Sequence, residues 1–181
     1  MRVIAGQAGG IRLKSIDTKD VRPTLDKVKE AVFSMILPYF PFDKGLDLYA
    51  GFGTLGLEAV SRGTAELTFV EKNRKYAKII KENIQKCKFE ERCEVKVENV
   101  FKYIQTCQSK YDIVFLDPPY KNNLVNKTLQ ALINNEILKK GAFIIVEHHR
   151  DEKIKDFQEF KTLKDRNYNE TVIKVYLHEG E

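Results

Sequence analysis

The chain has few of the residues that build disulfide frameworks, metal centres or membrane spans. Its three cysteines form an odd number without C-x-x-C spacing, and only three histidines are present to complete a metal site, so we expect reduced thiols and no metal. No apolar run approaches the roughly 20 residues of a membrane-spanning helix, and the first residues, MRVIAGQAGG, lack the apolar core of a signal peptide. These absences predict a soluble, cytoplasmic protein that does not bind membranes.

Internal repeats, low-complexity tracts and long linkers are also absent from the 181 residues. Hydrophobic residues make up 43% of the chain and charged residues 31%, a balance that supports a packed core rather than disorder. A chain of this length has room for one domain with a small appendage. By default we expect a monomer.

Positive charge is concentrated at the N-terminal end. The chain carries 31 basic and 26 acidic residues, a net charge of +5, and residues 1–16 contain Arg2, Arg12 and Lys14 but no acidic residue. A basic end of this kind favours binding to a polyanion. A solvated basic surface is the alternative interpretation.

Apolar strands and amphipathic helices alternate from residue 45 onward, which predicts a doubly wound α/β fold with a parallel sheet covered by helices on both faces. The segments IVFL and FIIV are continuous apolar runs of the kind that such a sheet buries. The predicted strands are residues 46–49, 67–71, 93–97, 113–117 and 142–147, and the predicted helices are residues 55–62, 75–86, 100–107 and 124–134.

The C-terminal end departs from this alternation. Residues 160–164 and 171–177 have the pattern of two strands joined by a short polar stretch, and a short connection permits only an antiparallel pair. A parallel sheet closed by an antiparallel hairpin resembles the sheet of S-adenosylmethionine-dependent methyltransferases. Nicotinamide-binding domains, by contrast, normally stay parallel throughout.

The N-terminal end also has its own pattern. Residues 2–5 and 11–16 flank three glycines and predict a small β-hairpin. An amphipathic helix follows, with Thr24 as a candidate N-cap and Pro38 as its stop.

A glycine-rich segment follows the first predicted strand of the sheet and precedes a helix. Gly51-Phe52-Gly53-Thr54-Leu55-Gly56 matches G-x-G-x-x-G, and Glu71 ends the next strand, 20 residues after Gly51. Glycines let the backbone approach a cofactor closely, and a carboxylate at that strand end can accept hydrogen bonds from both ribose hydroxyls. The pattern indicates an adenosine-like cofactor, with a purely structural strand-to-helix turn as the alternative.

Asp47 favours S-adenosylmethionine over a dinucleotide as that cofactor. Its carboxylate, four residues before Gly51, would repel a pyrophosphate at low local dielectric, whereas S-adenosylmethionine presents an ammonium and a sulfonium group. A strand aspartate paired with a lysine is the alternative. The side-chain amide of Asn99 stands where it can reach the adenine edge or cap the next helix. The predicted cofactor-binding residues of this region are Asp47, Gly51, Phe52, Gly53, Glu71, Asn99 and Val100.

The tetrapeptide Asp117-Pro118-Pro119-Tyr120 ends the fourth strand of the predicted sheet, at the edge where open α/β sheets bind ligands. The two prolines remove two N–H donors, so the turn presents only acceptors, which are the Asp117 carboxylate and the Pro118 carbonyl. Tyr120 adds a face on which a planar base can stack. These features predict a pocket for an exocyclic amine on a ring, with an ordinary proline turn as the alternative.

Taken together, these segments resemble the RsmD-like guanine-N2 methyltransferases of bacterial small-subunit (16S) ribosomal RNA. The resemblance runs along the whole chain, and its most discriminating parts are the Arg22-Pro23-Thr24 segment and the short N-terminal hairpin. The remaining residues that carry it are Arg2-Val3-Ile4-Ala5-Gly6, Leu13, Asp26-Lys27-Val28, Phe33, Leu46-Asp47-Leu48-Tyr49-Ala50-Gly51, Leu55-Gly56-Leu57-Glu58-Ala59, Ser61-Arg62-Gly63, Glu71, Asn99 and Asp117-Pro118-Pro119-Tyr120.

The resemblance implies a class I methyltransferase domain over residues 21–181 that uses S-adenosylmethionine, and an RNA-contacting β-hairpin extension over residues 1–20. It places the target amine at Asp117 to Tyr120 and brings Thr24 near the cofactor or the base entrance. The target guanine would be flipped out of its stack, within the small subunit or an assembly intermediate. The residues expected to hold RNA phosphates are Arg2, Arg12, Lys14, Arg22 and Lys27.

Two positions depart from the family pattern, and one pair of histidines adds a further expectation. Phe52 stands where the family usually has a small residue, and we expect its side chain to point to solvent or over the cofactor. Arg12 is shifted from the family's arginine-glycine pair, which changes its RNA contact. His148 and His149 follow the fifth strand and are expected at the surface or in a lid.

Four other functions remain open at this point. A DNA adenine-N6 methyltransferase shares the proline turn, but we find no insertion for a target-recognition domain. A glutamine-N5 protein methyltransferase typically has asparagine at the position of Asp117. An NAD-binding dehydrogenase fits the glycine loop but needs a separate substrate domain, and a noncatalytic RNA-binding module would explain only the basic end.

Overall fold

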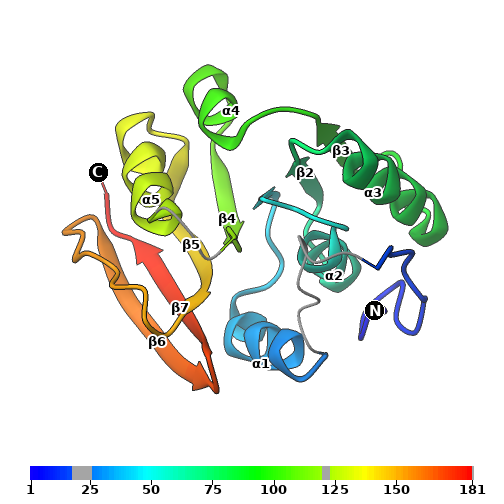
Figure 1. Cartoon of the computed structure of the whole chain (residues 1–181), viewed down its shortest axis with the longest axis horizontal. Coiled ribbons are helices and arrows are strands. Elements are labelled where there is room, and N and C mark those ends of the chain that lie inside the picture. The colour runs from blue at the N-terminus through cyan, green and yellow to red at the C-terminus, as the bar shows by residue number, and fades with distance from the viewer. Residues whose placement is uncertain (18–25, 120–122, 181) are drawn as a thin grey trace.

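A seven-stranded sheet forms the centre of the fold, with the strand order β3-β2-β1-β4-β5-β7-β6 (Figure 1). The computed structural model of the chain describes residues 1–17, 26–119 and 123–180. Strands β1 to β5 are parallel, and β7 runs antiparallel between β5 and β6. The strands are β1 (Lys44–Leu48), β2 (Glu66–Val70), β3 (Cys93–Lys96), β4 (Tyr111–Leu116), β5 (Leu138–His149), β6 (Phe160–Tyr168) and β7 (Thr171–His178). The predicted parallel sheet with an antiparallel hairpin is confirmed.

Helices cover both faces of this sheet, because side chains alternate between the faces along each buried strand. Ile113 and Phe115 of β4 pack in one apolar cluster with α1, α2 and α3. Val114 and Leu116 of the same strand pack in a second cluster with α4 and α5. The helices are α1 (Asp26–Ile36), α2 (Thr54–Arg62), α3 (Arg74–Cys87), α4 (Val100–Thr106) and α5 (Leu124–Asn134), and a 3-10 turn (Leu37–Tyr39) follows α1.

The N-terminal segment packs against α2, as Figure 1 shows. Its two arms are held by backbone hydrogen bonds, among them Val3 N–H to Ile11 O at 2.9 Å, and by one antiparallel bridge between Arg2 and Arg12. The predicted hairpin is therefore present as this short pairing. Val3 and Leu13 are buried in the same cluster as α1 and α2, so the described part of the segment shares the core of the domain.

The last three strands are longer than the sequence pattern predicts. β5 begins at Leu138 rather than at residue 142, and its start pairs with Tyr111 across a register irregularity. β6 continues to Tyr168, whereas the sequence pattern predicts an end at residue 164. The pattern misses the last residues because β6 is an edge strand and most of its side chains are exposed and polar. Only Asn169, at a φ of 57°, and Glu170 connect it to β7.

His148 corrects the expectation that both histidines at the end of β5 lie at the surface. Its side chain is buried, and its Nδ1 lies 2.8 Å from the carbonyl oxygen of His149. The physical reason is that β5 continues to His149 and pairs there with β7, where His148 lies opposite Val172. Burial lowers the pKa of His148, which favours the neutral ring.

Candidate active site at the carboxyl edge of the sheet

The predicted glycine loop lies between the end of β1 and the start of α2. Gly51 and Gly53 both have left-handed backbone angles, with φ of 57° and 79°, which glycine adopts without strain. A Cβ on Gly56 would lie 2.4 Å from the Phe69 ring of β2. Glycine at this position therefore lets α2 pack closely against the sheet, and the loop has the tight turn that the sequence predicts.

Glu71 connects the end of β2 to this loop. Its two carboxylate oxygens accept hydrogen bonds from Gly51 N–H at 2.9 Å and Asn73 N–H at 2.7 Å. Burial raises its pKa, and these backbone hydrogen bonds oppose the shift. Because a carboxylate has about four acceptor sites, Glu71 can hold the loop in place and still accept hydrogen bonds from a ligand.

Asp47 lies beneath the loop rather than at its surface. Only 2% of the residue is exposed, and its Oδ2 accepts a hydrogen bond from Gly56 N–H, in the first turn of α2, at 2.9 Å. Burial raises its pKa to about 7. Among the described residues, the hydrogen-bond partner of the carboxylate is therefore a backbone amide at a helix N-terminus, and not the lysine of the alternative interpretation.

Asp117 follows β4 and begins the proline turn. Its side chain is half-buried, Pro118 is buried and Pro119 is exposed, while Tyr120 lies outside the described residues. Burial and two nearby carboxylates, Glu147 and Asp47, raise the pKa of Asp117 well above its usual range. The sheet thus brings three carboxylates together at its carboxyl edge.

Asn99 and Val100 lie at the start of α4. The side-chain oxygen of Asn99 accepts a hydrogen bond from Phe101 N–H at 2.9 Å and caps the helix, which is the second of its two predicted roles. The residue is exposed, so its amide nitrogen is available to a ligand. Val100 is buried in the cluster on the α4 and α5 face.

Phe52 corrects the expectation about the second residue of the glycine loop. Its side chain is buried and packs edge-on against Tyr76 of α3, with ring centroids 5.3 Å apart. Ile79 belongs to the same small cluster. The ring therefore does not point to solvent, because Tyr76 and Ile79 of α3 offer it an apolar site, and its contact with a cofactor stays a prediction. Its carbonyl oxygen accepts a hydrogen bond from the Asn83 side chain at 3.1 Å.

Two of the predicted phosphate-binding residues form ion pairs with acidic side chains, and two others are exposed. Arg2 pairs with Asp26 at 3.2 Å, and Lys14 pairs with Glu82. Arg12 and Lys27 are both exposed, which leaves them accessible to an RNA backbone. Arg22, like Thr24, lies outside the described residues.

A buried charge cluster, not expected from the sequence, connects the N-terminal segment to the domain. Glu58 of α2 accepts hydrogen bonds from the backbone N–H groups of Ile4 and Ala5, at 2.7 and 3.1 Å. Its carboxylate also lies 3.4 Å from the ammonium group of Lys29 on α1 and 2.7 Å from Nε of Arg62. The available signal was the position of Lys29, which shares its helix face with Phe33 and Ile36.

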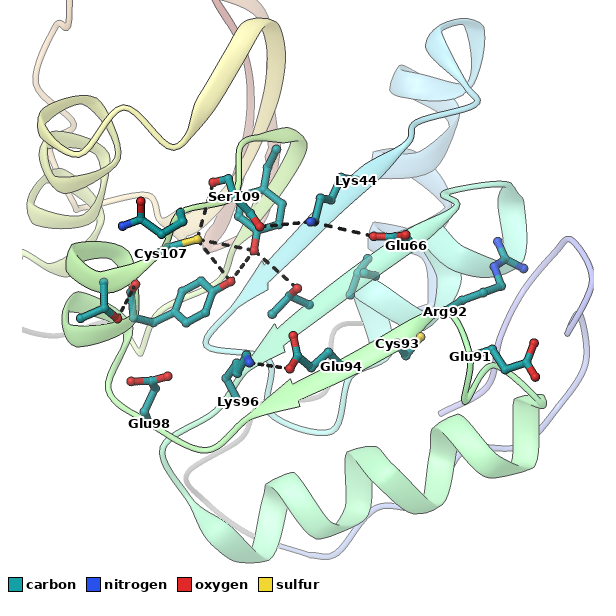
Figure 2. A pocket seen from close by; sticks show the side chains of 16 residues that line it. Lys44, Glu66, Glu91, Arg92, Cys93, Glu94, Lys96, Glu98, Cys107 and Ser109 are labelled. Atoms are coloured by element: carbon teal, nitrogen blue, oxygen red, sulfur yellow. Dashed lines mark hydrogen bonds and ion pairs between the residues drawn. The ribbon is translucent and has the colours of Figure 1, made fainter.

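A cavity of about 510 Å³ lies along β2 and β3 beside α4, and its walls carry Lys44, Glu94 and Cys107 (Figure 2). Tyr111 Oη donates a hydrogen bond to Thr68 Oγ1 at 3.4 Å there, and Lys44 Nζ donates to Ser109 Oγ at 3.1 Å. None of the predicted site residues is among those that line it. Glu98, which also lines it, directly precedes Asn99 in the chain.

Two further features concern only the described residues. Their His, Cys, Asp and Glu side chains form no group of three that could hold a metal ion. Their helices include none with the length and apolar character of a membrane span.

Comparison with known proteins agrees with this geometry. The family model described as "Conserved hypothetical protein 95" matches residues 1–177. The ribosomal RNA small subunit methyltransferase D of Haemophilus influenzae is 34% identical over 180 residues, which cover 97% of this chain and 93% of that protein. The chain belongs to the RsmD-like methyltransferase family.

Solved structures show that this family member has the class I methyltransferase fold. An Escherichia coli protein described as a candidate methyltransferase superposes with a TM-score of 0.88 at 28% identity, and the match covers 100% of this chain and 99% of that one. An RNA methyltransferase of Salinibacter ruber, solved with S-adenosyl-L-homocysteine, has a TM-score of 0.67 at 16% identity and covers 88% and 95%. The second likeness shows the fold alone.

Proposed function

We propose that this chain transfers a methyl group from S-adenosylmethionine to the 2-amino group of a guanine in bacterial 16S ribosomal RNA. It acts as a cytoplasmic monomer on the small subunit or on an assembly intermediate. The observation that supports the proposal most is the position of the Asp117-Pro118-Pro119 turn, an amine-accepting segment, at the same sheet edge as the glycine loop and Glu71. Family membership and the printed name of the Haemophilus influenzae relative support the RNA substrate.

The residues at this edge fit a cationic cofactor. Asp47, Asp117 and Glu147 lie close enough for their charges to interact, and such a site repels a pyrophosphate but attracts an ammonium or sulfonium group. When bound, S-adenosylmethionine supplies an electrophilic methyl group. The backbone of Gly51 and Gly53 lets the cofactor approach closely, and Glu71 has acceptor sites for the ribose hydroxyls.

The proline turn prepares the amine of the base for reaction. The nitrogen of a base amine is a poor nucleophile because its lone pair is delocalised into the ring. The Asp117 carboxylate and the Pro118 carbonyl accept the two N–H hydrogens, which orients the lone pair toward the methyl carbon. Asp117 stabilises the positive charge that develops on nitrogen as the N–C bond forms and the methyl–sulfur bond breaks, with the thioether S-adenosylhomocysteine as the leaving group, and the amine proton then passes to water. Tyr120 supplies a stacking face for the flipped base.

Phosphate contacts from the N-terminal segment position the RNA at this edge. Arg12 and Lys27 are exposed, whereas Arg2 and Lys14 would exchange their present ion pairs with Asp26 and Glu82 for phosphates. Such contacts place a nucleic acid without reading its sequence. A guanine within a helix cannot reach Asp117, so the target is unpaired or flipped.

The test is methyl transfer from isotope-labelled S-adenosylmethionine to undermethylated small subunits, to their naked RNA and to DNA, each followed by nucleoside analysis. We expect label in N2-methylguanosine from one of the ribosomal substrates. Label in N6-methyladenine would overturn the guanine assignment but keep the amine chemistry. Cofactor binding without transfer to any substrate would contradict the proposed reaction.

A further inference from the structure

The exposed side of α3 carries a row of positive charges outside the proposed active site. Residues 72–81 contain no acidic residue and five basic ones, which are Lys72, Arg74, Lys75, Lys78 and Lys81. Arg74, Lys78 and Lys81 follow one another at spacings of four and three residues, so they lie on one face of the helix. All three are exposed. These three residues form the α3 basic row.

The α3 basic row borders a groove of about 380 Å³, whose other lining residues are Ala77 and Val97. Val97 comes directly after β3 and is 44% exposed although it is apolar. The row begins next to Asn73, whose backbone N–H donates to Glu71 at 2.7 Å. The backbone N–H of Glu71 donates in turn to the carbonyl oxygen of Lys96, the last residue of β3, at 3.1 Å. One end of the groove therefore lies at the carboxyl edge of the sheet.

The charges of the α3 basic row are not compensated within the protein. Among the described residues, no acidic side chain forms an ion pair with a member of the row. Glu82, in the next turn of α3, is already paired with Lys14. The hydrogen bond from Lys14 lowers the pKa of Glu82, and the charges of Lys78 and Lys86 add to that effect. Because like charges four residues apart destabilise a helix, the stability of α3 does not explain the row.

Charge selects the ligand that this groove can hold. Its positive side chains repel the ammonium and sulfonium groups of S-adenosylmethionine and attract the phosphates of a nucleic-acid strand. The helix also contacts the N-terminal segment, because the backbone N–H of Lys14 donates to Asn83 Oδ1 at 2.6 Å. Figure 1 shows α3 beside both β3 and the N-terminal segment. An RNA strand that contacts the segment therefore has a positively charged path over α3 to the carboxyl edge.

We propose that the α3 basic row and its groove bind the phosphates of the ribosomal RNA strand that flanks the target guanine. This inference rests on the proposed function, which supplies RNA as the polyanion. It adds a second contact surface to the N-terminal segment, on the other side of α3. Phosphate contacts position a nucleic acid without reading its sequence, so the row sets the affinity for RNA and its salt dependence, and not the choice of base.

The test is the double variant Lys78→Gln with Lys81→Gln, which removes two charges of the row and keeps good helix formers at both positions. Binding to naked 16S RNA and to undermethylated small subunits would be measured over a range of salt concentrations. We expect weaker binding to both, with a slope of log K against log salt that falls by about 0.7 for each lost phosphate contact. In methyl transfer, KM should rise while kcat stays within about twofold of wild type, because the row does not touch the reacting atoms.

The matched control is the double variant Lys164→Gln with Arg166→Gln. It removes the same charge at exposed residues of β6, at the opposite edge of the sheet from β3, and it should keep the wild-type slope. Thermal unfolding checks that each variant is folded. The wild-type slope in the folded α3 variant, or an equal loss in the control, would overturn the inference.

Two further outcomes would assign the groove to another ligand and also overturn the inference. A loss of binding confined to assembled subunits would indicate an acidic protein surface as the partner. A loss of S-adenosylmethionine affinity in calorimetry, without a change in the salt slope, would indicate a part of the cofactor site. Failure of wild type to methylate any ribosomal substrate, with the slope difference intact, would instead overturn the proposed function alone.

Discussion

At the scale of single residues, buried carboxylates dominate the candidate site. Asp47, Asp117 and Glu147 come from three neighbouring strands, and burial and mutual repulsion raise the pKa of Asp47 and Asp117. A site that keeps such groups loses some stability for function, which is a common feature of ligand-binding sites. The role of Asp117 in methyl transfer and the effect of the buried Asp47 charge on stability can be tested separately.

Asp117→Ala should remove methyl transfer while leaving cofactor binding largely intact. We expect a loss of at least about 10²-fold in turnover, because the variant loses the acceptor that orients the amine and stabilises its developing charge. Calorimetry with S-adenosylmethionine and single-turnover transfer would measure the two effects separately. Asp151→Ala, at an exposed residue after β5, is the control. Near-normal transfer in folded Asp117→Ala would refute the role of Asp117.

Asp47→Asn should make the protein more stable at alkaline pH. The pKa of Asp47 is raised from 3.8 to about 7 in the folded state, so the folded protein binds a proton more tightly than the unfolded chain does. Stability contributed by this group is therefore complete below pH 4 and is lost as the pH rises through about 7.

Asparagine keeps an acceptor for the Gly56 amide but carries no charge. At pH 8 we expect its free energy of unfolding to exceed that of wild type by about 2 to 4 kcal/mol, and at pH 4 we expect little difference. Urea denaturation at both pH values would measure this, with Asp17→Asn, at an exposed residue, as the control. An equal effect at the two pH values would show that the titration of Asp47 is not its cause.

At the scale of elements, the N-terminal segment, α1 and α2 are held together by Glu58. The residue is 0% exposed, and its partner Lys29 is 2% exposed. Lys29 also donates a hydrogen bond to the Arg2 carbonyl oxygen. The Glu58 carboxylate thus has four partners, which are the side chains of Lys29 and Arg62 and the backbone N–H groups of Ile4 and Ala5. This arrangement gives the basic N-terminal segment a fixed place beside the domain.

Glu58→Gln should destabilise the fold by about 3 to 5 kcal/mol, because it leaves the buried Lys29 ammonium without its counter-charge. Burial already lowers the pKa of Lys29, and the Glu58 charge opposes that shift, so the lysine would become neutral more easily in the variant. Chemical denaturation would measure the loss, and hydrogen exchange at Ile4 and Ala5 would report the release of the segment. Glu30→Gln, on the exposed side of α1, is the control. A change below about 1 kcal/mol would show that this pair does not support the fold.

At the scale of the whole molecule, the basic N-terminal segment lies beside the helix that follows the glycine loop, and under the proposed function both would contact one substrate. The segment packs on α1 and α2, and the glycine loop leads into α2. RNA phosphates held by the segment would therefore lie near the loop that approaches the cofactor. The net charge of +5 is modest, so RNA binding should depend on where the exposed charges lie more than on their number.

Neutralising Arg12 and Lys27 together with glutamine should weaken RNA binding and reduce its dependence on salt. For single-stranded contacts the slope of log K against log salt should fall by about 0.7 per lost phosphate contact. The control is the pair Lys110→Gln and Lys140→Gln, which removes the same charge at exposed residues near the start of β4 and β5. Affinity would be measured at low and moderate salt. The same slope in wild type and in the Arg12 and Lys27 variant would refute these phosphate contacts.

The sequence by itself determined the parallel core of the fold and the segments of the site. Buried parallel strands must be apolar along their length, and the loop and the proline turn depend on glycine and proline backbones, so all three leave a readable pattern. The edge strand β6 has a weak sequence pattern, because its exposed polar residues are also typical of a loop.

Only the tertiary structure decided how charges and rings far apart in sequence meet. Phe52 packs against Tyr76 of α3, Glu58 forms an ion pair with Lys29, and the register of β4 and β5 places Glu147 beside Asp117. Burial and pairing depend on the elements that pack around a residue, and a local pattern does not contain them. The sequence therefore identifies the chemistry available at the sheet edge, and packing decides which groups share it.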